Sequence, residues 1–164
     1  RLYNGVYLER RAHMLDLSQI SRWRENNRLE AKLATGGLPQ SLWETYSAFA
    51  NTYGGGILLG VEELPDHSLR VQGLLDAREM AEELCAMLDD RRVVSANILA
   101  EDQIRVAEVD GAQIIVMEVP PAPRDQLPVY LGKNPFTGSY RRSGDGDYHC
   151  SWGEVVTMLG DRDH

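Results

Sequence analysis

The chain has 164 residues, the length of one ordinary domain, and 43% of them are hydrophobic, which is enough to build a core. Its formal net charge of −8 disfavours indiscriminate binding to nucleic acids. No apolar run approaches the ~20 residues that span a bilayer, and no charged-then-apolar leader points to export. We therefore expect a cytoplasmic domain that does not enter a membrane.

The chain begins at Arg1 and ends soon after its last predicted helix, which suggests a domain cut from a longer protein. We expect an N-terminal arm over residues 1–14, one domain over residues 15–160 and a tail over residues 161–164. Cys85 and Cys150 lack a Cys-x-x-Cys spacing, so we expect two reduced thiols, with Cys85 in the core.

Charge is distributed unevenly along the chain. Residues 1–33 carry seven basic and four acidic side chains, or +3, and residues 124–142 also carry +3. Residues 62–90 carry nine acidic and two basic side chains, or −7. The two basic segments either converge into one patch, away from the acidic helix, or are separate solvated faces.

The first half of the chain predicts two helices and two principal strands. Ser18 is a suitable cap for a short helix that ends near Asn26. Apolar and polar residues alternate over 28–34, as in a strand with one buried face. Residues 39–50 have helical periodicity, and residues 57–61 are continuously apolar, as in a strand that is buried on both faces.

The second half predicts further strands and two capped helices. Asp76 begins a helix with Glu79 three residues on, and Ser151 begins another with Glu154 three residues on, as in capping boxes. The dipeptide 110–111, Asp-Gly, predicts a tight hairpin. The remaining expected strands are 69–73, 93–100, 103–109, 112–119, 129–131 and 139–142. Together these elements indicate an α+β or mixed α/β fold with helices packed on a twisted mixed β-sheet.

The glycines after the 39–50 helix predict a tight turn. Phosphate-binding glycine loops follow a strand and open a helix, whereas here a helix precedes Gly54 and Gly55 and a strand follows them. At least one of the two is expected to have a positive φ. Asn51, near the helix end, is expected to hydrogen-bond local backbone.

Several motifs, taken in order, resemble one known family. They are Glu30-Ala31-Lys32, Ala48-Phe49-Ala50-Asn51-Thr52-Tyr53-Gly54-Gly55, Leu58-Leu59-Gly60-Val61, Val119-Pro120 and Tyr140-Arg141-Arg142. This set is similar to the Schlafen/AlbA-type DNA-binding domain, and the resemblance covers residues 15–160. It implies an N-terminal domain of a bacterial transcriptional regulator or helicase-like protein. It further implies DNA as partner, C-terminal domains with ATP binding in the full-length protein, and a role in regulating transcription.

The resemblance and the charge pattern indicate which basic residues would bind nucleic acid. An arginine on the last strand would grip phosphate through its planar fork. We expect an exposed patch on one side of the fold, although Arg142 has the alternative of an ion pair with Asp145 or Asp147. The candidate nucleic-acid-binding residues are Arg28, Lys32, Lys133, Arg141 and Arg142.

A second interpretation concerns acidic residues. The resemblance to RNA-cutting Schlafens aligns their three catalytic acids with Glu25, Glu30, and Glu62 or Glu63. Clustered carboxylates would hold Mg²⁺ or Mn²⁺ for phosphodiester cleavage. The third position carries Glu where the family usually has Asp. The alternative is a surface pair of Glu30 and Lys32, with a solvated strand end at 62–63.

No cofactor is expected otherwise, because the histidines lack zinc-ligand spacing and no Walker lysine is present. The sequence thus leaves three functions open. They are a DNA-binding regulatory domain, which we favour, a metal-dependent ribonuclease, and a dimerisation or protein-interaction domain with no nucleic-acid role. The chain is also a candidate for homodimer formation.

Overall fold

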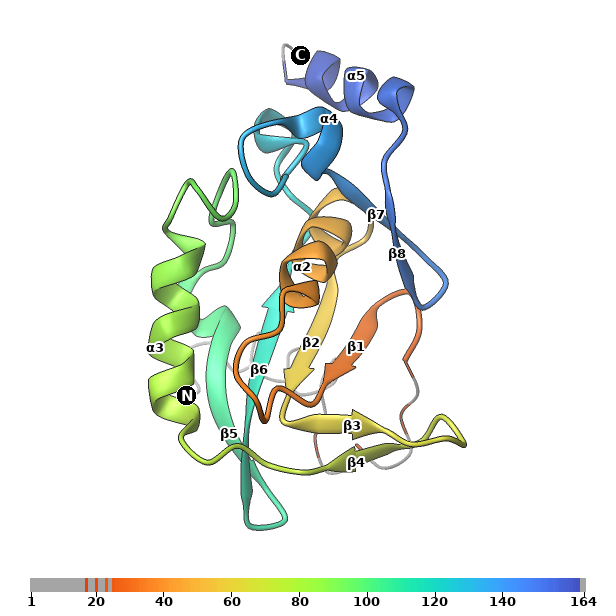
Figure 1. The fold of residues 1–164 in the computed structure, drawn as a ribbon. Coiled ribbons are helices and arrows are strands. Elements are labelled where there is room, and N and C mark those ends of the chain that lie inside the picture. The colour runs from red at the N-terminus through yellow and green to blue at the C-terminus, as the bar shows by residue number, and fades with distance from the viewer. Residues whose placement is uncertain (1–16, 18–19, 21–22, 24, 163–164) are drawn as a thin grey trace, which may run out of the picture.

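A four-stranded mixed sheet forms the centre of the computed structural model, which describes residues 17, 20, 23 and 25–162 (Figure 1). The strands are β1 (Leu29–Lys32), β2 (Gly55–Leu59), β5 (Ile104–Val109) and β6 (Ala112–Val119), in the order β1-β2-β6-β5. Strands β1 and β2 run parallel, and the other neighbours are antiparallel. The expected arm over 1–14 and most of the expected helix over 18–26 lie outside the described residues, while Asn26 itself forms a β-bridge with Leu29 instead of a helical turn.

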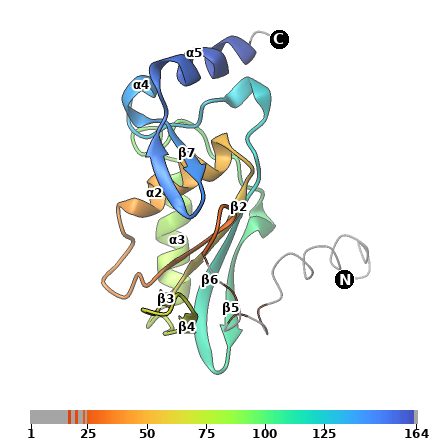
Figure 2. The ribbon, with the colours of Figure 1, turned by 90° about the vertical axis from the view of Figure 1, so that its right-hand side faces the viewer.

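Two helices cover one face of this sheet, α2 (Ser41–Asn51) and α3 (Ala77–Leu88) (Figures 1 and 2). Their apolar side chains pack against Ile57, Leu59 and Met117 in the larger core cluster. A smaller cluster on the other face contains Leu58 and Val116. Strand β2 is therefore buried on both faces, as its unbroken apolar sequence predicts.

Local capping interactions fix the starts of α3 and α5 (Trp152–Asp161). The Asp76 carboxylate accepts a hydrogen bond from the backbone N–H of Glu79 at 3.0 Å. The Ser151 hydroxyl accepts one from the Glu154 N–H at 3.1 Å, and the Glu154 carboxylate accepts one from the Ser151 N–H at 2.6 Å. Both predicted helix starts are confirmed, since each cap satisfies N–H groups that lack partners inside the helix.

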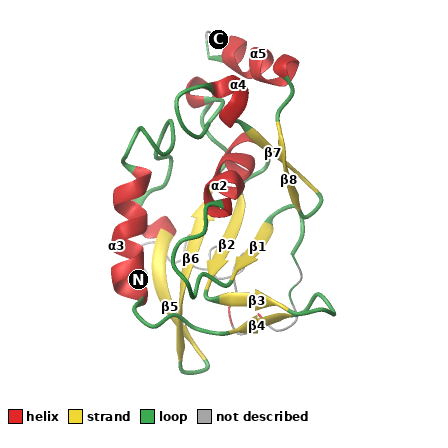
Figure 3. Cartoon of the chain, in the orientation of Figure 1, coloured by secondary structure: helices red, strands yellow, loops and turns green. Residues whose placement is uncertain are grey.

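Two small hairpins complete the fold (Figure 3). Strands β3 (Val61–Glu63) and β4 (Leu69–Val71) pair beside β1. The strand expected over 57–61 breaks at Gly60, whose φ of +93° suits glycine and turns the chain into β3. Strands β7 (Tyr140–Ser143) and β8 (Gly146–His149) pack on α2, and α4 (Pro135–Gly138) lies against α5.

The structure differs from the expected local structure in several places. Residues 93–100 form a loop, because the Tyr46 hydroxyl donates to the Ala96 carbonyl at 2.9 Å and accepts from the Ile98 N–H at 3.0 Å. Strand β8 has no counterpart in the predicted elements. Cys85 is exposed on α3, although both cysteines are free thiols as expected. No described helix has the length and apolar character needed to cross a membrane.

Candidate functional site

The motif at the end of α2 ties together segments that are far apart in sequence. The Asn51 amide donates to the carbonyls of Val129 and Tyr140, each at 3.0 Å, and its oxygen accepts from the Val129 N–H at 2.8 Å. The Thr52 hydroxyl accepts from the Arg142 N–H at 3.0 Å. The expectation of local backbone bonds for Asn51 is therefore wrong, because its backbone partners lie in distant segments that it fastens to α2.

The two glycines of the turn serve different purposes. Gly54 has a φ of +74°, so the expected positive φ is confirmed there. Gly55 allows close packing, since a Cβ at this position would lie 2.8 Å from the Phe49 ring and 2.9 Å from the Arg28 carbonyl oxygen. The turn thus needs glycine once for its backbone conformation and once for space.

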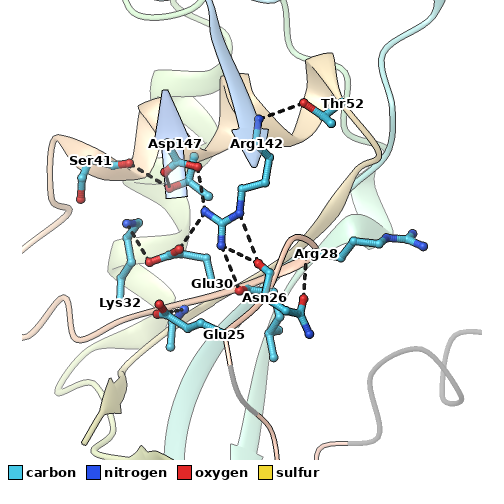
Figure 4. A network of polar contacts seen from close by, with 12 residues as sticks. Glu25, Asn26, Arg28, Glu30, Lys32, Ser41, Thr52, Arg142 and Asp147 are labelled. Carbon is cyan, nitrogen blue, oxygen red and sulfur yellow. Dashed lines mark hydrogen bonds and ion pairs between the residues drawn. The ribbon is translucent and has the colours of Figure 1, made fainter. Parts of the chain in front are cut away.

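A buried arginine lies at the centre of a polar network between β1, β7, β8 and α2 (Figure 4). The Arg142 guanidinium pairs with Asp147 at 2.7 Å and with Glu30 at 2.9 Å. It also donates to the carbonyl oxygens of Asn26 at 2.8 Å and Leu29 at 3.2 Å. On the other side of the network, the Thr45 hydroxyl donates to Asp147 at 2.6 Å.

This network changes the interpretation of two predicted binding residues. The Arg142 side chain is completely buried, so the expectation that it is exposed is wrong. The alternative of an ion pair with Asp147 is confirmed. Lys32 is 11% exposed and lies 3.4 Å from Glu30. Both cations face the interior of the network, so the exposed patch expected from Arg28, Lys32, Lys133 and Arg142 is not formed by those four residues.

The other three basic candidates are accessible to solvent. Arg28 is exposed, and its side chain points away from the network (Figure 4). Lys133 is exposed in the loop before α4. Among the described residues, neither forms an ion pair. Arg141 is 42% exposed, lies 3.4 Å from Glu154 and has its guanidinium carbon 5.6 Å from the centre of the Tyr148 ring.

The acidic candidates come from three segments of the chain, and some of them meet. Burial raises the pKa of Glu25 to about 7, with a smaller contribution from the negative charges of Glu30 and Glu63. The backbone N–H of Ala31 donates to the Glu25 carboxylate at 3.0 Å. Glu62 is turned to a different partner, because it pairs with Arg70 at 2.6 Å. Glu25, Glu30 and Glu63 are thus the acids that the fold brings near one another.

These acids do not form a metal site in the arrangement seen. Both oxygens of Glu30 already face cations, with Arg142 at 2.9 Å and Lys32 at 3.4 Å. Glu63 lies 3.4 Å from His67. Within the part of the chain that the structure describes, no group of three or more His, Cys, Asp or Glu side chains is positioned to hold a metal ion.

Aromatic side chains near the C-terminal helix were not predicted as functional residues. Phe136 of α4 and Trp152 of α5 stack with their ring centres 5.8 Å apart, and they are 38% and 70% exposed. Tyr148 of β8 is 50% exposed. The sequence did not indicate that these rings are exposed. For Phe136 and Trp152, exposure depends on how two short helices meet.

Comparisons with known proteins identify related domains. The profile of the family described as "Schlafen, AlbA_2" matches residues 25–151. The structure is similar to the solution structure of the N-terminal domain of a protein from Nitrosomonas europaea whose name relates it to the ATP-dependent DNA helicase RecG. That match has 28% sequence identity and a TM-score of 0.60, and it covers 85% of this chain and 92% of that one.

A second similar structure places the same fold within a longer protein. It is the crystal structure of a protein from Corynebacterium diphtheriae, with 15% identity and a TM-score of 0.60. The match covers 93% of this chain but 28% of that one, so the domain occurs within larger chains. The comparison with curated proteins found no match.

Proposed function

This chain belongs to the Schlafen AlbA_2 family, and from that premise we propose that it is the DNA-binding module of a larger, cytoplasmic transcriptional regulator. The similarity to the N-terminal domain of a RecG-related helicase protein supports the proposal. That protein's name connects this type of domain with a larger chain that acts on DNA. The C-terminal domains of the full-length protein would then supply ATP binding.

The observation that carries the proposal is the separation of charge between two sides of the fold. Helix α3 carries exposed acidic side chains on one side, including Glu79, Glu82 and Glu83. Figure 1 shows the start of β1 and the β7–β8 hairpin on the other side. Arg28 and Arg141 belong to these segments. A surface that presents exposed cations away from the acidic helix can approach phosphates despite the net charge of −8.

The buried network contributes to binding indirectly. The Arg142 guanidinium donates to the carbonyl oxygens of Asn26 and Leu29, and so it joins the segment that carries Arg28 to the β7–β8 hairpin. A fixed spacing between Arg28 and Arg141 reduces the entropy that must be lost when both contact one DNA backbone. Phosphate contacts of this kind set affinity and register without reading base sequence.

The test is a comparison of binding by charge-removing variants. Fluorescence anisotropy with a labelled 20-base-pair duplex at low salt would measure the Kd of Arg28→Ala and Arg141→Ala. We expect both variants to bind every duplex sequence more weakly, by a similar factor, because the lost contacts are to phosphate. The matched control is Arg78→Ala, which removes an exposed arginine from α3.

Two results would contradict the proposal. If Arg78→Ala weakened binding as much as Arg28→Ala, the contact surface would not be the one proposed. If the wild-type domain bound no nucleic acid at low salt, the protein-interaction alternative would replace it.

A metal-dependent ribonuclease is the second candidate. The observation in its favour is the approach of Glu25 to Glu30 and Glu63, which contributes to the raised pKa of Glu25. Because Glu30 is already paired with two cations, metal binding would require it to exchange a partner. The test is the melting temperature with and without Mn²⁺, together with incubation with transfer RNA. A rise in Tm that Glu25→Gln abolishes, with cleavage of the RNA, would favour this candidate, and no response to Mn²⁺ would exclude it.

A further inference from the structure

Two aromatic rings form an exposed stack at the junction of α4 and α5. The Phe136 and Trp152 rings are nearly parallel, with an angle of 24° between their planes and 5.8 Å between their centres. Trp152 is 70% exposed although it is the first residue of α5. The fully buried residue of that helix is Val155. Docking of α5 thus uses Val155, whereas much of the indole surface remains in water, where it gains little from the hydrophobic effect.

The charges next to this stack favour an anionic ligand. Lys133 is exposed three residues before Phe136 and forms no ion pair among the described residues. The nearest acid in sequence, Glu154, accepts hydrogen bonds from its own helix start and faces Arg141 at 3.4 Å. These contacts hold the pKa of Glu154 below its usual value, the backbone bond from Ser151 being the largest cause. The negative charge of Glu154 is therefore largely compensated by the Ser151 N–H and by Arg141.

We propose that Phe136 and Trp152 form a stacking platform for the bases of single-stranded nucleic acid, with Lys133 at the adjoining phosphate. The inference rests on the proposed nucleic-acid-binding function and narrows its ligand class. Base–aromatic stacking accepts any base, since every base has a π face. A duplex hides those faces inside its own stack and offers base edges instead. An exposed flat ring, with an unpaired lysine three residues before its stacking partner in the sequence, is therefore suited to an unpaired strand, such as one found at a melted or unwound site.

The experiment compares two single strands that have equal numbers of phosphates. One is a labelled dodecamer of thymidines, and the other is a labelled dodecamer of abasic sites. Both are titrated with the wild-type domain, with Trp152→Leu, which removes the ring but keeps an apolar side chain, and with Trp152→Phe, which keeps a ring. Leu75→Ala, at an exposed apolar residue just before α3, is the control for loss of exposed apolar surface.

The proposal predicts that Trp152→Leu weakens binding to the base-bearing strand by about 10-fold and leaves binding to the abasic strand unchanged. Trp152→Phe should retain binding of the base-bearing strand within about threefold, and Leu75→Ala should bind both strands as the wild type does. Lys133→Ala should weaken binding to both strands, because both carry phosphates.

Equal binding of the base-bearing strand by wild type and Trp152→Leu would overturn the platform. If Trp152→Leu and wild type also bound duplex DNA, the proposed DNA-binding function would stand without the stacking platform. Absence of binding to single strand and duplex alike would overturn both. Equal loss for both strands in a folded Trp152→Leu, checked by its melting temperature, would assign Trp152 to the structure of the α4–α5 junction and also overturn the platform.

Discussion

Replacing the buried arginine Arg142 by Met should destabilise the fold severely. The substitution keeps an unbranched side chain of moderate length but removes the ion pairs with Glu30 and Asp147 and the bonds to two backbone carbonyls. Both carboxylates are 13% exposed, so they would remain desolvated with fewer partners. Removing one partner of a buried ion pair costs about 3–5 kcal/mol, a large part of the ~5–15 kcal/mol that stabilises a typical domain.

The assay is thermal and urea unfolding followed by circular dichroism. For a chain of this size, a loss of about 3–5 kcal/mol corresponds to a fall in Tm of roughly 6–20 °C. Combining Arg142→Met with Glu30→Gln and Asp147→Asn should recover part of the stability, because the uncompensated charges are then absent. The matched control is Arg141→Met. It alters the preceding residue of the same strand and removes the exposed ion pair with Glu154, whose atoms lie 3.4 Å apart.

The reasoning is refuted if Arg142→Met costs less than about 1 kcal/mol, the usual range for an exposed ion pair. It is also refuted if Arg141→Met and Arg142→Met lower stability equally. Either result would mean that the arginine is not held inside the fold and that its role is at the surface.

Three further predictions concern stability. Asn51→Leu should leave buried backbone groups without partners, first of all the N–H of Val129. The free energy of unfolding, measured in urea, should fall by about 1–3 kcal/mol for each such group. Gly55→Val should cost about 1–3 kcal/mol because its side chain would collide with the Phe49 ring, and a native-like Tm would contradict this packing. The pKa of Glu25 is raised from 4.5 to about 7, so the folded state binds its proton more tightly than the unfolded state does. Stability should therefore fall as pH rises from about 4.5 to 7, and Glu25→Gln should flatten this fall in a series of melting curves.

Elements defined by local interactions could be predicted from the sequence. The starts of α3 and α5 depend on side chains within three residues of each cap, and Asp110-Gly111 adopts positive φ at both positions, as a tight hairpin requires. The buried strand β2 was predictable because its apolar run has no polar interruption before Gly60. In each case the signal lies within the segment itself.

Features that depend on distant contacts could not be predicted in this way. Strand alternation places Arg141 and Arg142 on opposite faces, but the sequence does not say which face the hairpin turns toward α2. Residues 93–100 look like a strand, yet bonds to Tyr46, about 50 residues away in sequence, hold them as a loop. The sequence of β8 is polar, and its pairing with β7 became evident only from the fold.

The central claim, that this domain binds DNA through exposed cations on the side opposite α3, is tested most directly by a salt titration. The observed association constant for a 20-base-pair duplex would be measured from about 50 to 200 mM salt for wild type and Arg28→Ala. The account predicts that log K falls linearly with log salt concentration and that Arg28→Ala flattens the slope by about one unit. A binding constant that does not respond to salt, or a slope that Arg28→Ala leaves unchanged, would contradict it.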